Sequence, residues 1–129
     1  MRPRTLLITT TALELPTGLA LLLVPSVVTE LLPGEELAAP AAIAIGRVAG
    51  IALVAIGASC WLAGKGDGTS RPTDLIAGLL IYNVAITVLL GHASLALEMH
   101  GILSWPAVVG HTALALWCVG CLRSRGASP

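Results

Sequence analysis

Four apolar segments, each long enough to cross a lipid bilayer, dominate the sequence. They cover residues 5–24, 41–62, 75–97 and 105–122. A helix that crosses the hydrocarbon core needs about 20 predominantly apolar residues. Leu, Ala, Ile and Val follow one another here in long runs, whereas membrane β-strands alternate apolar and polar residues. The sequence therefore predicts an all-α protein, a four-helix transmembrane bundle that forms a single domain over residues 1–129.

The composition excludes two other classes of protein. Only 11% of the residues are charged and 56% are apolar, whereas a soluble domain carries about 25% charged residues. The chain cannot cover a water-facing surface, so membrane lipid is its expected partner. Seven basic and seven acidic side chains cancel, and no basic stripe is present that could bind nucleic acid.

The distribution of basic residues predicts the orientation in the membrane. Cytoplasmic connections carry an excess of Lys and Arg. Six of the seven basic residues precede the first segment, separate the second from the third, or follow the fourth. These six are Arg2, Arg4, Lys65, Arg71, Arg123 and Arg125. The other two connections contain glutamates but no Lys or Arg. We therefore predict a multi-pass protein of the bacterial inner membrane with both termini in the cytoplasm.

Small residues recur at helical spacing in the second segment. Gly46 and Gly50 are four residues apart, Gly57 follows two turns later, and Ala42 precedes them by one turn. Small residues at this spacing let two helix backbones approach closely in lipid. The pattern predicts a packing seam, either within the bundle or between protomers. A homo-oligomer or a place in a larger membrane complex is expected.

Each segment contains one ionisable residue at membrane depth. From a rise of 1.5 Å per residue, Glu14 lies roughly 15 Å and Arg47 roughly 10 Å below the outer boundary, with His92 and His111 at roughly 8–9 Å. Asn83 lies deeper in the third segment. An ionisable group in hydrocarbon costs about 2.5–3.5 kcal/mol on insertion scales, so such groups are candidate functional residues.

Two interpretations of these residues remain open. In the first they are architectural: Glu14 and Arg47 form a buried salt bridge, and the histidines are hydrogen-bonded between helices. In the second, Glu14, Arg47, Asn83, His92 and His111 line one pocket for a lipophilic small molecule, quinone- or lipid-like. Arg47 would then orient a carbonyl or an anionic head group. We expect binding rather than catalysis, and no catalytic residue is assigned.

The histidines also raise the question of a cofactor. His92 and His111, on adjacent antiparallel helices, could ligate a haem as in membrane b-type cytochromes, but few aromatic residues are available to pack the macrocycle. A metal ion would need a third ligand, and no tight ligand spacing is present. The sequence predicts no metal site and leaves the cofactor open.

The three cysteines are expected to be core residues. Cys118 and Cys121 form a C-x-x-C pair near the inner end of the fourth segment, and Cys60 lies near the inner end of the second. The predicted topology places all three at the reducing, cytoplasmic side, where structural disulfides are rare. Cysteine in such a setting behaves as a small apolar residue.

The first half of the chain resembles the small four-helix DoxX-like membrane proteins of bacteria. The resemblance lies in Glu14, Pro16, Gly18 and Pro25, followed by Gly46-Arg47-x-x-Gly50-x-x-Leu53-x-x-x-Gly57. It implies a quinone-facing membrane subunit, because some relatives are linked to thiosulfate and quinone chemistry.

The position of Glu14 is also similar to that of the glutamate in the small multidrug resistance exporters. The resemblance implies a proton-coupled exporter of cationic substrates. Arg47, the two membrane histidines and the scarcity of aromatic residues depart from that family's pattern.

Overall fold

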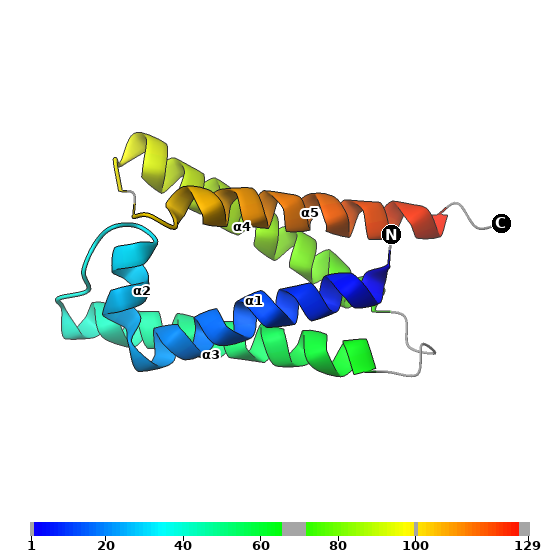
Figure 1. Ribbon diagram of the computed structural model, residues 1–129, viewed down its shortest axis with the longest axis horizontal. Helices are drawn as coiled ribbons and strands as arrows, with labels where there is room; N and C mark the ends of the chain where they lie inside the picture. Colours follow the sequence, from blue (N-terminus) through cyan, green and yellow to red (C-terminus); the bar gives the residue numbers. More distant parts are fainter. Residues whose placement is uncertain (1, 66–71, 100, 127–129) are drawn as a thin grey trace.

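The structure, a computed structural model, describes residues 2–65, 72–99 and 101–126, and all the regular structure in these ranges is helical (Figure 1). Arg71, one of the six basic residues that predict the orientation, lies outside the described residues.

Four long helices carry the apolar segments. They are α1 (Pro3–Leu23), α3 (Pro40–Lys65), α4 (Thr73–Ala96) and α5 (Ser104–Gly126). Each is long and apolar enough to cross a membrane. The predicted boundaries are confirmed to within about one turn of helix, because the apolar runs set the length of each helix. Proline occupies the first position of α1 and α3, where its missing N–H has no helical partner to lose.

Large apolar side chains are exposed along all four long helices. Ile45 is 71% exposed, Ile81 72% and Leu95 73%. A water-soluble domain rarely exposes contiguous apolar surface of this extent. The exposed faces therefore fit a protein surrounded by lipid.

Helix α1 packs closely along α3 through glycines. A β-carbon added to Gly50 would lie 2.7 Å from the carbonyl oxygen of Gly18, and one added to Gly18 would lie 2.7 Å from the backbone nitrogen of Val54. Farther along, a β-carbon on Gly57 would lie 3.1 Å from Leu15. The glycine seam predicted in α3 is confirmed as a contact within the chain, against α1.

Helices α4 and α5 form the second pair. The Asn83 and His111 side chains connect the two helices with a distance of 2.8 Å between Oδ1 and Nδ1. One turn away, the hydroxyls of Thr87 and Thr112 lie 3.5 Å apart. These polar contacts set the register of α4 against α5.

A short helix, α2 (Pro25–Leu31), connects the two pairs at one end of the molecule. The backbone N–H of Gly101 donates to the carbonyl of Leu32 at 2.8 Å, and that of Leu103 donates to Leu31 at 2.8 Å. The connection between α4 and α5 is thereby bound to the end of α2.

The apolar core lies toward the opposite end, where α1 begins and α5 ends (Figure 1). Side chains from all four long helices meet there. The fully buried ones include Leu6, Leu7 and Ile76 together with Cys60, Cys118 and Cys121. All three cysteines are free thiols. Their complete burial confirms the prediction that they are core residues.

Candidate functional site

A buried acidic residue lies on the inner face of α1. The buried residues of this helix include Leu7, Thr10, Thr11, Glu14 and Gly18, and their spacing of three to four residues defines one face. Glu14 is only 3% exposed. Its carboxylate lies on the same face as the apolar core, so the fold holds it away from lipid.

Tyr82 of α4 is the hydrogen-bond partner of this carboxylate. The Tyr82 hydroxyl donates to Oε2 of Glu14 at 3.0 Å. The Tyr82 ring also meets the His111 imidazole edge to face, with centroids 5.7 Å apart and planes at 80°, which is a favourable geometry for two aromatic rings. Tyr82 therefore links a residue of α1 to a residue of α5.

Asn83 of α4 is the hydrogen-bond partner of His111. The Asn83 side chain is fully buried; its Nδ2 donates to the carbonyl of Leu79 at 2.7 Å, and its Oδ1 lies 2.8 Å from Nδ1 of His111. Glu14, Tyr82, Asn83 and His111 thus form one connected group, which we call the polar cluster. Glu14 and Asn83 are buried, whereas Tyr82 and His111 are half-buried.

The predicted salt bridge between Glu14 and Arg47 is wrong. Glu14 accepts a hydrogen bond from Tyr82, and within the described residues it forms no ion pair. Arg47 is exposed and lines a surface hollow at the corner between α1 and α2, next to Pro25.

The register of α1 against α3 explains the error. Leu15 lies opposite Gly57, and Pro25 lies opposite Gly46. Arg47 is therefore about ten residues, or roughly 15 Å along the axis, from the level of Glu14. Depths counted from the helix ends assumed that α1 ends at the level where α3 begins, but the first turns of α3 extend beyond the end of α1 (Figure 1).

His92 also lies outside the polar cluster. Its side chain is exposed on α4, nine residues beyond Asn83, which is roughly 13 Å along the axis. Of the five residues predicted to line one pocket, the structure brings together Glu14, Asn83 and His111. It leaves Arg47 and His92 outside this group.

Tyr82 was not singled out from the sequence. It is the only tyrosine in the chain, and it precedes Asn83 in an otherwise apolar stretch of α4. A hydroxyl at membrane depth needs a hydrogen-bond partner, which was the available indication. Its pairing with Glu14 depends on how α4 lies against α1, and no sequence spacing encodes that.

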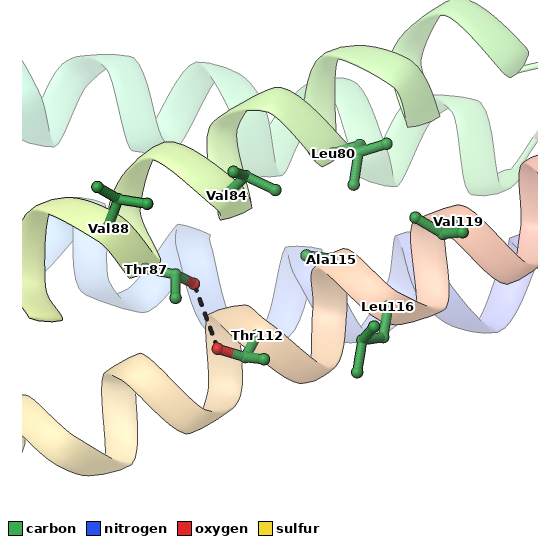
Figure 2. Close-up of a pocket in the computed structure, with 8 residues that line it drawn as sticks. All are labelled: Leu80, Val84, Thr87, Val88, Thr112, Ala115, Leu116 and Val119. Carbon is green, nitrogen blue, oxygen red and sulfur yellow. Dashed lines mark hydrogen bonds between the residues drawn. The ribbon is translucent and has the colours of Figure 1, made fainter.

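A separate apolar groove lies between α4 and α5. It encloses about 260 Å³, and Figure 2 shows it with α4 and α5 in front of α1 and α3. It is lined by Leu80, Val84, Thr87, Val88, Thr112, Ala115, Leu116 and Val119. The Thr87–Thr112 contact closes one end, and the rest of the lining offers no polar group.

Within the described residues, no group of three His, Cys, Asp or Glu side chains is arranged to hold a metal ion. No family model, no curated protein and no solved structure matches this chain. The resemblance to the DoxX-like proteins therefore stays a prediction.

Proposed function

We propose that this protein is an integral membrane protein that binds a lipophilic small molecule, quinone- or lipid-like, at the polar cluster. One observation carries the proposal: the Glu14 carboxylate, 3% exposed, meets the Tyr82 hydroxyl and lacks a cationic partner within the described residues. Ionisable groups at membrane depth are costly, rare and characteristic of ligand and ion sites.

The arrangement of the polar cluster also favours a ligand. Tyr82 and His111 are half-buried, with Glu14 and Asn83 behind them, so a head group could reach the two rings without unfolding the helix pairs. The neighbouring residues are predominantly apolar, as in most small-molecule sites, where a few polar groups orient the ligand. Arg47 and His92 are no longer part of the proposed site. No residue is assigned a catalytic role.

The membrane orientation is part of the proposal. Helix α1 begins and α5 ends at the same end of the molecule (Figure 1), and Arg2, Arg4, Lys65 and Arg123 belong to that end. The positive-inside rule predicts that this end lies in the cytoplasm. The proposal also includes a location in a bacterial inner membrane, as a homo-oligomer or a subunit of a larger complex. A C-terminal fusion should be active with a cytoplasmic reporter and inactive with a periplasmic one; the reverse result would overturn this orientation.

The ligand is tested by extraction of the purified protein. The wild type, a Glu14→Gln/His111→Gln variant and a matched Arg47→Gln/His92→Gln control are purified in mild detergent, and their solvent extracts are compared by mass spectrometry. We expect one lipophilic compound, near one per chain, in the wild type and the control, and its loss from the cluster variant. Equal amounts in all three, or no such compound in any, would refute the proposal.

A proton-coupled exporter is the second candidate, and one observation favours it. Glu14 is not neutralised by Arg47, and a tyrosine lies beside it, so two objections raised by the sequence are weakened. Dye uptake into vesicles that depends on a proton gradient and is abolished by Glu14→Gln would favour the exporter. Uptake that is unchanged by Glu14→Gln would exclude it.

A further inference from the structure

The hydrogen bonds of the polar cluster determine which ring nitrogen of His111 carries hydrogen. The Asn83 amide donates from Nδ2 to Leu79, so the atom facing His111 is its carbonyl oxygen, Oδ1. An amide oxygen can only accept. Nδ1 of His111 is therefore the donor in this contact. In a neutral imidazole only one nitrogen carries hydrogen, so Nε2 of His111 is left as an acceptor.

The remaining atoms of the cluster point to the same property. A phenol has a single hydrogen, and Tyr82 already donates it to Glu14, so the Tyr82 oxygen can only accept from a ligand. The half-buried front of the cluster, formed by Tyr82 and His111, thus has acceptors available and its donors already engaged.

From this pattern we infer that the polar cluster selects lipophilic molecules whose head group donates hydrogen bonds. The inference rests on the proposed function and narrows its ligand class to hydroxyl- or ammonium-bearing lipophiles. It excludes head groups that only accept, such as quinone carbonyls or anionic carboxylates. The latter would have required Arg47, which lies roughly 15 Å along the axis from the level of Glu14.

A further buried hydroxyl lies on α1 next to the polar cluster. The Thr10 side chain is fully buried one turn before Glu14, and its Oγ1 has no hydrogen-bond partner within the described residues. On the buried face of α1, Thr10 lies between Glu14 and the core residues Leu6 and Leu7.

Two matched pairs of probes test the inference on the purified full-length chain in detergent. 4-Dodecylphenol is compared with 4-dodecylanisole, which replaces O–H by a methyl ether. Dodecylammonium is compared with dodecyltrimethylammonium, which keeps the charge but has no N–H. An acceptor left unpaired on binding weakens affinity, so we expect the donating member of at least one pair to bind about tenfold more tightly. The pair that responds identifies the head group as a hydroxyl or an ammonium.

Variants assign the preference to the cluster. His111→Phe should reduce the difference within the responding pair to less than about threefold, whereas the exposed control His92→Gln should retain it. Glu14→Gln introduces an amide donor and should also weaken the preference. The ¹⁵N spectrum of the wild-type histidines gives an independent check that requires no variant, because His111 should carry its hydrogen on Nδ1.

The outcomes separate this inference from the function on which it rests. If all four probes bind with similar affinity and His111→Phe abolishes binding, the cluster is a ligand site but the inference is wrong. If His111 carries its hydrogen on Nε2, the inference is also wrong. If none of the probes binds, both the inference and the proposed function are contradicted.

Discussion

Replacing Gly50 by alanine tests the close contact between α1 and α3. The new β-carbon would lie 2.7 Å from the carbonyl oxygen of Gly18 and 2.8 Å from the backbone nitrogen of Leu22. Ordinary contacts of a β-carbon with other heavy atoms lie at 3.4–4 Å. Because both neighbours are backbone atoms, no side-chain rotation relieves the overlap. Helices α1 and α3 must move apart by about 1 Å along their shared seam.

The magnitude follows from two opposing effects. Overpacking of a close contact costs about 1–3 kcal/mol, whereas alanine is favoured over glycine in a helix by up to about 1 kcal/mol. Gly78 of α4 provides the matched control, because a β-carbon there meets nothing within 4 Å. The helix preference is common to both substitutions, so the Gly50→Ala variant should be less stable than Gly78→Ala by about 1–3 kcal/mol.

The assay is the free energy of unfolding in mixed micelles, measured by titration with a denaturing detergent and followed by tryptophan fluorescence. Gly18→Ala should lower the free energy of unfolding by about as much as Gly50→Ala. The double variant should lose less stability than the two single variants added together, because the first substitution has already separated the helices. Equal stability of Gly50→Ala and Gly78→Ala would show that α1 and α3 do not approach as closely as the structure describes.

Two further predictions concern the polar residues. Arg47→Gln should change the free energy of unfolding by less than about 0.5 kcal/mol, because the side chain is exposed. A loss of about 3–5 kcal/mol, which is typical of a broken buried ion pair, would show that Arg47 does pair with Glu14. A double-mutant cycle between Asn83 and His111, measured by the same titration, should give a coupling of about 0.5–3 kcal/mol. The control cycle between Asn83 and His92 should be additive, and equal couplings in the two cycles would contradict the described register.

The positions of the long helices and their suitability for a lipid environment could be predicted from the sequence, because both depend on the composition of continuous segments. An apolar run of about 20 residues can satisfy its backbone in lipid only as a helix, so the boundaries followed from where charged and turn-forming residues interrupt the runs. The spacing of Gly50 and Gly57 predicted a close helix contact for the same reason. It could not identify α1 as the partner, because Gly18 lies on a different part of the chain.

The membership of the polar cluster was decided by tertiary structure alone. Position in the sequence gives the relative depth of residues on α1 and α3 only if α1 ends at the level where α3 begins, and α3 begins beyond the end of α1 (Figure 1). Arg47 was therefore placed beside Glu14 when it lies at the corner with α2. Tyr82 reached Glu14 because the α4–α5 pair presents that face to α1. Sequence spacing specifies which residues share a helix face, but the rotation and axial shift between helices arise from side-chain packing over the whole chain.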